Sequence, residues 1–570
     1  MAFPFEAEIA AGLQQGFAAC GIAAASLPLR RIPNAEGWGY ASSLALSQGQ
    51  GKEAAQALAA EVAGWLLATG RFQRVDALNG YVNVYIDPRE AAGHVLAAVE
   101  SQAGRYGAGA PTGERVMVEF SAPNTHKEFH VGHLRNTVFG NALSHMLAFA
   151  GAEVITNNYV GDIGAHVIRC LWCLNRHHAG EEPPADRLDW LGRIYSEAVR
   201  RIEEEPEAKD QIAALFARWD RGDVTLREQW RETRAWCIDE LERIYRQLGV
   251  HFDVWYFESE VEAEGKRMAE ELLERGIAEV SEGLPIVRLG DKLGVLPILR
   301  SDGTSLYATK ELALAVKKFR EHQVSRAIII TGVEQTLYFK QLFAVLERYG
   351  FEHARDLRHI AYERINLPDG KMSSRLGNIV TYEDLAAEAV ERVTRIIKEK
   401  NPTLPPEQRQ RTAEEVAVSA LKFAMLCVGN NSVITFDWER VLDFDGFAGP
   451  YLQYAYVRAA RILEKAGSPA PTTAPNAIDV PLEPVERAIL ETLADFPNQV
   501  SRAAEQHAPV TLANYTYTLA KQFSEFYQAC PVLEAPAEAL RVFRLRLVAG
   551  VKQVLANGLT LLGLSLPEAM

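Results

Sequence analysis

The stretch from Glu119 to Gly140, EFSAPNTHKEFHVGHLRNTVFG, decides the expected fold of this chain. Residues 115–120 have the pattern of a short strand, a Pro-Asn pair breaks it, and a helix with apolar periodicity is expected from about Val131. His130 and His133 stand three residues apart at the start of that helix, so their imidazoles share one face beside the first backbone amides and the positive end of the helix dipole. The sequence therefore predicts a phosphate site at this junction.

The spacing of the two histidines is unusual enough to carry weight. With 13 His and 41 Gly in 570 residues, His-x-Gly-His is expected by chance about 0.02 times. Gly132, inside the motif, would let a nucleotide base lie flat against the backbone; the alternative is that both histidines only cap the helix or pack in the core. The stretch resembles the HIGH signature of class I aminoacyl-tRNA synthetases, and Ser121-Ala-Pro-Asn124 with Lys127 makes it similar to the arginyl-tRNA synthetase version.

The resemblance implies an enzyme that activates L-arginine with ATP and transfers the arginyl group to the terminal ribose of tRNA(Arg), with bound tRNA required for activation. Such a reaction needs no protein nucleophile, because positioning and neutralisation of charge suffice. Mg²⁺ is expected to arrive with the ATP. The residues that match the family's ATP and pyrophosphate groups are His130, His133, Gly132, Lys127, Lys371 and Arg375. By this resemblance the histidines bind phosphates, the glycine faces adenine, and the basic side chains face the leaving pyrophosphate.

The resemblance also implies an arginine pocket, which must offer a carboxylate and neutral acceptors to a planar cation with five donors. Glu119 and Asn124 match family residues that hold the α-amino end. Tyr307, Glu311 and Gln335 match those around the side chain, and Tyr307 and Glu311 are one helical turn apart. Glu311 stands where Asp is usual in the family, which predicts a shifted pocket.

Further departures leave an inactive tRNA-binding relative open as an alternative. Gly370-Lys-Met-Ser-Ser-Arg-Leu-Gly-Asn378 is similar to the KMSKS loop of the family, but Ser374 replaces its second lysine. The resemblance implies that Lys127 compensates for this change. His166 and Tyr338 stand where Gln and His are common.

The composition limits the classes of protein to which this chain can belong. The chain has 60 Lys and Arg against 74 Asp and Glu, a net charge of −14, so nucleic acid must be bound by local basic patches rather than by a global field. The six cysteines lack the spacing of a disulfide framework, Glu6 and Glu8 stand where a signal peptide has lysines, and no apolar run approaches a membrane span. We expect a cytoplasmic protein without membrane contact.

The fold class expected is multidomain, α/β plus α. Residues 1–105 are predicted to form an additional α+β domain, and 106–385 a Rossmann-type catalytic domain with a parallel sheet and a helical insertion at about 180–300. Strands of that sheet are expected at 115–120, 153–159, 326–331 and 359–365. Residues 386–570 read as an all-helical domain, which is similar to the DALR-type anticodon-binding bundle.

Three residues are assigned to tRNA by the resemblance. Gly80-Tyr-Val-Asn-Val is similar to the tip of the additional domain that contacts the tRNA elbow, so Tyr81 is expected to stack on a D-loop base and Asn83 to bind a base edge. Glu538-Ala-Leu-Arg541 is similar to the DALR box, which makes Arg541 a candidate contact. The alternatives are a half-buried tyrosine in an edge strand and a solvated basic face on the last helix.

The pair Cys170 and Cys173, with His177 and His178 nearby, raises the question of zinc. The run reads as helical and has no second Cys-x-x-Cys, so structural burial is favoured and no protein-bound metal is expected. A cysteinyl-type synthetase, which needs a thiolate zinc site, is the second alternative within the enzyme class. A monomer is expected because no exposed apolar stripe calls for a partner.

Overall fold

The computed structural model describes residues 4–23, 27–32, 38–48, 51–72, 74–301, 303–366, 380–467 and 480–570. Lys371, Arg375 and Ser374 lie outside the described residues. The chain divides into two compact units. Their segments are Met1–Gly109, Leu452–Arg502 and Asn514–Leu559 for the first unit, and Ala110–Tyr451, Ala503–Ala513 and Thr560–Met570 for the second.

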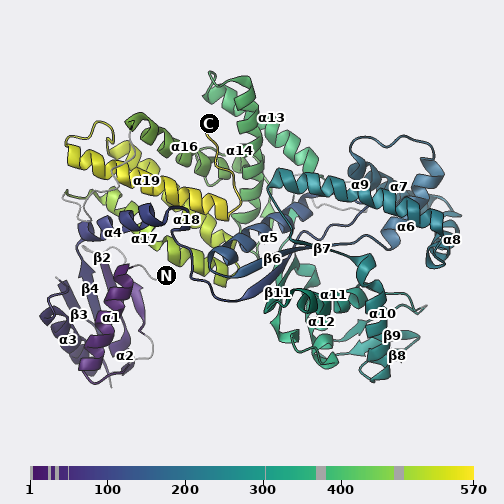
Figure 1. Cartoon of the computed structure of the whole chain (residues 1–570), viewed down its shortest axis with the longest axis horizontal. Helices are drawn as coiled ribbons and strands as arrows, with labels where there is room; N and C mark the ends of the chain where they lie inside the picture. Colours follow the sequence, from purple (N-terminus) through teal and green to yellow (C-terminus); the bar gives the residue numbers. More distant parts are fainter. Residues whose placement is uncertain are drawn as a thin grey trace. The chain divides into compact units, whose positions relative to one another are not determined.

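A five-stranded parallel sheet forms the centre of the second unit (Figure 1). Its strands, in spatial order, are β12 (Leu357–Tyr362), β11 (Arg326–Gly332), β5 (Arg115–Glu119), β6 (Glu153–Val160) and β7 (Val254–Phe257). The chain crosses from the centre outward on both sides of β5, so the sheet is doubly wound, as the sequence predicts. Four of the strands were expected, and β7 was not, because its four residues lie within the predicted helical insertion.

The region at 180–300 is only partly the helical insertion that the sequence predicts. It begins with helices, but β7 joins the central sheet, and a separate antiparallel sheet of order β10-β9-β8 follows. The elements of this region are α7 (Arg187–Glu204), α8 (Ala208–Asp220), α9 (Val224–Leu248), α10 (Glu258–Glu274), β8 (Glu279–Ser281), β9 (Leu284–Arg288) and β10 (Val295–Pro297). The helical prediction is wrong here because the strands are short. Most of their sequences are aromatic or contain Pro, and the charge-rich helices around them hide the strand pattern.

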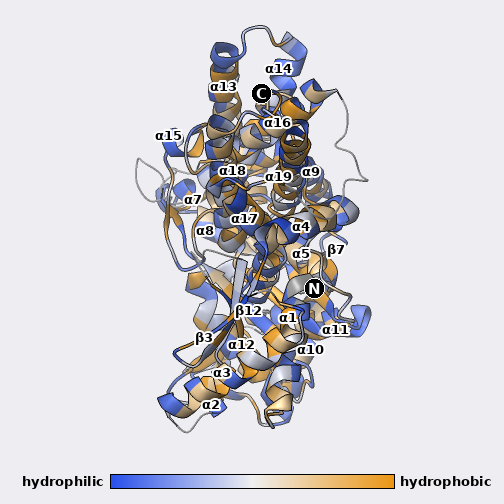
Figure 2. Ribbon diagram, turned by 90° about the vertical axis from the view of Figure 1, so that its left-hand side faces the viewer, coloured by the Kyte–Doolittle hydropathy of each residue, from blue (hydrophilic) through white to orange (hydrophobic). Residues whose placement is uncertain are grey.

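The remaining elements of the second unit are helices around the sheet and one two-stranded ladder, in which β13 pairs with β14. They are α5 (Val131–Phe149), α6 (Ala165–His177), α11 (Tyr307–His322), α12 (Thr336–Tyr349), β13 (Ile365–Asn366), α13 (Tyr382–Lys400), α14 (Pro406–Leu426), β14 (Ile434–Thr435) and α15 (Trp438–Val441). Figure 2 shows apolar and polar stretches along the same helices, α13 among them. On α13 the buried residues recur every three or four positions, from Tyr382 to Ile397.

The first unit combines an α+β module with helices from the far end of the chain. Its antiparallel sheet has the order β1-β2-β4-β3, and Tyr81 is the first residue of β4. The module contains α1 (Pro4–Ala19), β1 (Leu29–Arg31), β2 (Trp38–Ser42), α2 (Leu44–Gln48), α3 (Lys52–Ala68), β3 (Arg74–Leu78), β4 (Tyr81–Ile86) and α4 (Pro88–Gln102). The helices are α16 (Gly449–Ala466), α17 (Pro484–Glu505), α18 (Pro509–Ala529) and α19 (Glu538–Leu561).

The arginines of α19 are less exposed than the sequence suggests. Arg544 donates to Glu486 at 2.7 Å and Arg546 binds Glu100 through two hydrogen bonds of 2.8 and 3.0 Å. Both side chains are buried, so they hold the unit together rather than forming a solvated basic face. Of the described helices, none has the length and apolar character that would let it cross a membrane.

Helix α5 packs directly on the end of β5, and a glycine makes this possible. A Cβ added at Gly140 would lie 2.1 Å from Cγ of Phe120, which is fully buried. We expect Gly140→Ala to destabilise the protein by about 1–3 kcal/mol or more, because a well-packed core cannot accept the extra methyl group. Thermal unfolding measures this. Gly64→Ala on α3, where no atom lies within 4 Å of the new Cβ, is the control; an equal effect of both substitutions would refute the packing argument.

Candidate active site

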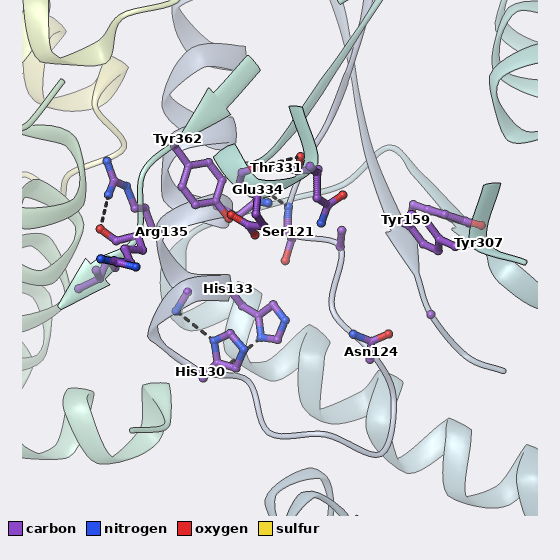
Figure 3. Close-up of a pocket in the computed structure, with 18 of the residues that line it drawn as sticks. Ser121, Asn124, His130, His133, Arg135, Tyr159, Tyr307, Thr331, Glu334 and Tyr362 are labelled. Atoms are coloured by element: carbon purple, nitrogen blue, oxygen red, sulfur yellow. Dashed lines mark hydrogen bonds between the residues drawn. The ribbon is translucent and has the colours of Figure 1, made fainter. Parts of the chain in front are cut away.

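A cavity of about 470 Å³ opens at the carboxyl ends of β5, β6, β11 and β12 (Figure 3). This is the edge at which ligands of doubly wound sheets bind. Six of the residues predicted from the sequence line it: Asn124, His130, Gly132, His133, Tyr307 and Gln335. Figure 3 shows His130 and His133 in the middle, Tyr159 and Tyr307 toward one end, and Arg135 and Tyr362 toward the other.

The two histidines form a stacked pair at the first turn of α5. Their ring centroids are 3.9 Å apart with an angle of 17° between the planes. The backbone N–H of Gly132 donates to Nδ1 of His130 at 3.1 Å, and the N–H of His130 donates to Nδ1 of His133 at 3.4 Å. Both Nδ1 atoms are therefore acceptors, and each neutral ring carries its proton on Nε2. The histidines do cap the helix, and the capping leaves an Nε2–H donor on each ring.

Burial keeps both imidazoles uncharged at neutral pH. It lowers the pKa of His130 to about 4, and the positive charge of Lys127 acts in the same direction. Burial lowers the pKa of His133 well below the usual value, with His130 and Lys127 adding to the effect. The pair therefore offers phosphate two neutral donors beside the helix N-terminus, where backbone dipoles supply positive potential.

The loop between β5 and α5 has an unusual backbone. Ser121, Ala122 and His126 have φ angles of 73°, 46° and 61°, in the left-handed region that non-glycine residues rarely occupy. Asn124 pairs with Gly161 as an isolated parallel bridge, and a Cβ on Gly161 would lie 2.3 Å from Oδ1 of Asn124. The loop thus carries Asn124 across to the end of β6, into the cavity wall.

A buried carboxylate lies behind the tyrosine end of the cavity: it is not itself a lining residue, but it is hydrogen-bonded to Tyr307, which is. Glu311, on α11, is only 2% exposed. Burial and the charge of Glu119 raise the pKa of Glu311 well above the usual carboxyl range, and Lys318 and a hydrogen bond from Tyr307 oppose them. Such a site favours a ligand that brings a positive charge.

Several buried polar atoms on and around the cavity wall have no partner among the described residues. They are Oη of Tyr159, Oη of Tyr338 and Oε1 of Gln335, and all three are buried. Electrostatic interaction with Glu311 raises the pKa of Tyr159 and Tyr338, after burial as the larger cause, so both phenols stay protonated. Buried polar atoms without partners are rare and costly, and here they would accept hydrogen bonds from a ligand with many donors.

The carboxylate of Glu119 is held in place by an ion pair and a hydrogen bond. Glu119 is 4% exposed, binds Nζ of Lys318 at 2.6 Å and accepts a hydrogen bond from Nδ2 of Asn157 at 2.8 Å. It is not among the residues that line the cavity. The prediction that Glu119 holds the α-amino group of arginine therefore meets a carboxylate that is already paired.

Two family models together match most of this chain. The family model of the class I tRNA synthetases (R), catalytic domain, matches residues 95–438, and the DALR anticodon binding domain matches residues 452–570. The arginine–tRNA ligase of Bdellovibrio bacteriovorus is 35% identical over 500 residues, 86% of this chain and 86% of that protein. The chain belongs to the class I arginyl-tRNA synthetases.

Two further relatives agree with this assignment. The arginine–tRNA ligase of Clostridium botulinum is 34% identical over 501 residues, 88% of each chain. The solved structure of Thermus thermophilus arginyl-tRNA synthetase superposes with a TM-score of 0.80 and 27% identity, covering 99% of both chains. Membership in the arginyl-tRNA synthetase family confirms the resemblance that the Glu119–Gly140 stretch suggested, and it sets aside the cysteinyl-type reading.

The far end of the cavity in this arginyl-tRNA synthetase contains residues that the sequence analysis did not single out. Arg135 is 1% exposed and donates to the backbone carbonyls of Glu363, Arg364 (3.2 Å) and Ser432 (3.3 Å). Its guanidinium carbon lies 5.4 Å from the ring centroid of Tyr362. Arg135 therefore ties α5 to the segment that follows β12. No local signal in the sequence distinguishes Arg135 from other arginines, because its partners lie more than 200 residues away along the chain.

Lys127 stands beside the histidines. Its Nζ lies 5.0 Å from the ring centroid of Tyr195 on α7. Burial lowers its pKa, with Arg169 acting in the same direction, whereas Glu128 and Glu258 oppose the shift. The placement agrees with a cation that acts near the histidines, and its predicted partners Lys371 and Arg375 fall outside the described residues.

The cysteine-rich run lies on α6, away from the cavity. Cys170 donates from Sγ to the carbonyl of Leu191 at 3.4 Å. Cys173 comes near His178 and Glu197, and these three form the one group with metal-ligand geometry in the described part of the chain. Both ring nitrogens of His178 already bind carboxylates at 3.0 Å, those of Glu181 and Glu197. A hydrogen-bonded ion pair explains this cluster, and the expectation of no bound metal stays a prediction.

The residues predicted to contact tRNA differ in exposure. Tyr81, at the start of β4, is 40% exposed, whereas Asn83 on the same strand is 8% exposed. Arg541 is half-buried and pairs with Glu538 at 3.2 Å. Tyr81 is therefore the more accessible of the two predicted positions in the additional module.

The two histidines should titrate far below an ordinary imidazole. We expect the NMR signals of the His130 ring to show a midpoint near pH 4, because burial disfavours its charged form. The unfolded chain takes up these protons near pH 6.5, so the pair reduces folding stability as the pH falls from about 6.5 toward 4. The variants His130→Asn and His133→Asn assign the signals. Midpoints near 6.5 for both rings would contradict the neutral, capping tautomers.

Proposed function

We propose that this chain activates L-arginine with ATP to form arginyl-adenylate and then transfers the arginyl group to the terminal ribose of tRNA(Arg). The observation that carries the proposal is one cavity with neutral donors at a helix N-terminus in its middle and, at one end, a lining tyrosine, Tyr307, hydrogen-bonded to a buried carboxylate behind it. The curated relatives, whose names are those of arginine–tRNA ligases, support it. In-line attack of the arginine carboxylate on the α-phosphate requires only that both substrates meet in this cavity.

The ATP half of the reaction falls to the N-terminus of α5. Nε2–H groups of His130 and His133 would donate to phosphate oxygens, and Gly132 would face the adenine ring, where a Cβ would obstruct it. Neutral donors suit this role because they bind the charge that develops in the transition state without repelling the Lys127 cation beside them. We assign the phosphates to the histidines for this reason.

The leaving pyrophosphate needs positive charge. Lys127 supplies it from beside the histidines, and Lys371 with Arg375 would add to it from the predicted loop. Ser374 leaves that loop one lysine short, and the position of Lys127 near His130 supports the compensation that the family resemblance implies. Mg²⁺ would come with the ATP, held chiefly by phosphate oxygens and water, as this ion prefers.

The arginine half falls to the end of the cavity where Tyr307 and Gln335 lie. Glu311 would receive the guanidinium, and Gln335 would accept a further hydrogen bond from it. Tyr159 and Tyr338, which the sequence did not assign, would complete the set of acceptors. Asn124, at the cavity wall, would bind the α-amino end.

Recognition of tRNA involves both ends of the chain in this proposal. Tyr81 would stack on an unpaired base, and Asn83, being buried, would contribute after a local rearrangement or not at all. Arg541 would contact the anticodon arm from α19. We further propose a monomer in the cytoplasm; the six free cysteines agree with a reducing compartment.

Exchange of pyrophosphate into ATP tests the function directly. With each of the twenty amino acids in turn, we expect exchange with arginine alone, and only when tRNA is added. Exchange with arginine at full rate in RNA-free enzyme would contradict the tRNA requirement. Tight tRNA binding without exchange for any amino acid would instead favour the inactive relative that Glu311 and Ser374 left open.

The unpaired phenols give a separate prediction. We expect Tyr159→Phe and Tyr338→Phe each to lower kcat/KM for arginine by about tenfold to a hundredfold, since each removes a hydrogen bond to a charged group, worth about 1.5–3 kcal/mol. Folding stability should not fall, because neither hydroxyl has a partner among the described residues. Tyr349→Phe is the matched control on α12, where the hydroxyl binds Glu271 at 2.5 Å. Unchanged kinetics in both test variants would refute the assignment.

A further inference from the structure

Lys318 is a buried lysine for which the proposed reaction has no stated use. It lies on α11, seven residues after Glu311, so both side chains fall on the same side of the helix. Its side chain is 1% exposed. A lysine is almost never buried to this degree without a partner, because removing an ammonium group from water costs several kcal/mol. The partner of Lys318 therefore indicates the role of this lysine.

That partner is Glu119, at the last position of β5. Nζ of Lys318 lies 2.6 Å from Oε2 of Glu119, and Asn157 of β6 donates to the same oxygen at 2.8 Å. Glu119 and Asn157 are register partners in the parallel sheet. The carboxylate is thus fixed from the side of the sheet and from α11 at once. It has little freedom left to turn toward a ligand in the cavity.

The charges in this buried region do not balance. Glu119 pairs with Lys318 of α11. Glu258 of α10 pairs with Lys310, which also lies on α11. Glu311 is left over: among the described residues, no cation lies within salt-bridge distance of it. Two neutral pairs and one extra carboxylate give the desolvated site a single negative charge whenever Glu311 is ionised. Such a site is complementary to one cation, and arginine brings a guanidinium that is always charged.

We propose that Lys318 is a positioning residue of the arginine site, which neutralises Glu119 and so leaves Glu311 as the single carboxylate that receives the guanidinium. This inference rests on the proposed function. It also reassigns Glu119 from a direct ligand of the α-amino group to the counter-ion of Lys318. Lys318 touches neither substrate; it sets which carboxylate is available and in which protonation state.

The protonation of Glu311 gives this role a measurable signature. The titratable groups that act on Glu311 are Glu119 of β5, Tyr159 of β6, Glu258 of α10, Tyr307 and Lys318 of α11, and Tyr338 of α12, and Lys310 of α11 is paired with Glu258. Burial and Glu119 raise its pKa, and Lys318 lowers it. Below that pKa the free site holds a proton that arginine must displace. Affinity for arginine therefore rises with pH and levels off above the pKa of Glu311.

The test compares variants by the pH dependence of KM for arginine, measured as tRNA charging at saturating ATP and tRNA. Lys318→Met should move the break in log KM to higher pH and raise KM at neutral pH about tenfold for each unit that the break moves. kcat at saturating arginine should change little. Lys318→Arg should keep the wild-type break. Lys317→Met, the adjacent lysine, which pairs with Glu321 at 3.4 Å, is the matched control and should behave as wild type.

Glu119→Gln should act in the opposite sense. Its substitution removes the charge that raises the pKa of Glu311, so the break should move to lower pH. The freed Lys318 would turn to Glu311 and compete with the guanidinium, so KM should rise at every pH. If Lys318→Met fails to fold, the double variant with Glu119→Gln removes both buried charges together. Its break should then lie above that of Glu119→Gln alone.

The outcomes separate two kinds of failure. Wild-type protein that charges no arginine would overturn the proposed function, whatever the variants do. A second outcome would overturn the role of Lys318 alone. In it, the wild-type protein charges tRNA with arginine, and the break in log KM lies at the same pH in wild type, Lys318→Met and Lys317→Met. The double variant then also has the same break as Glu119→Gln. A loss of kcat without a change in the break would show a purely structural role and would also overturn it.

Discussion

Burial of carboxylates at the carboxyl edge of the central sheet is the constraint on which this active site depends. Three of them, Glu119, Glu258 and Glu311, are almost wholly removed from water, and two find ammonium partners. An ion that leaves water without a partner loses more free energy than the fold can spare, so it titrates instead. The raised pKa of Glu311 is the result. In the proposed arginine site, Glu311 would therefore give up its proton when the guanidinium binds beside it.

The start of α5 meets a second constraint, because the first amides of a helix lack partners. Here the rings of His130 and His133 accept two of them through Nδ1. This capping fixes the tautomer, and the tautomer fixes which nitrogen can donate to a ligand. Lowered pKa values keep the rings in this form over the physiological range. In the proposed ATP site, one set of hydrogen bonds would therefore serve both helix formation and phosphate binding.

Local signals in the sequence predicted local structure well. The helix at Val131 and the strands at 115–120, 153–159 and 326–331 appear where the sequence indicates them. Long-range pairing was less accessible. Lys317 and Lys318 look alike as a basic pair in a helix, and only the packing of α11 against β5 turns one of them inward. β7 escaped notice because four residues carry too little periodicity to separate a strand from its helical surroundings.

In the proposed arginine site, the acceptors at the tyrosine end of the cavity would let the protein select arginine among cations. Lysine would satisfy the charge of Glu311, but its three donors diverge from one nitrogen. They cannot reach the separate acceptors on Tyr159, Tyr338 and Gln335, which would stay buried and unpaired. Sites built to hydrogen-bond a substrate reject an analogue that lacks the groups by factors of about 10⁴–10⁵. Discrimination of this size, produced by acceptors that lysine leaves unpaired, would make a separate hydrolytic step against lysine unnecessary.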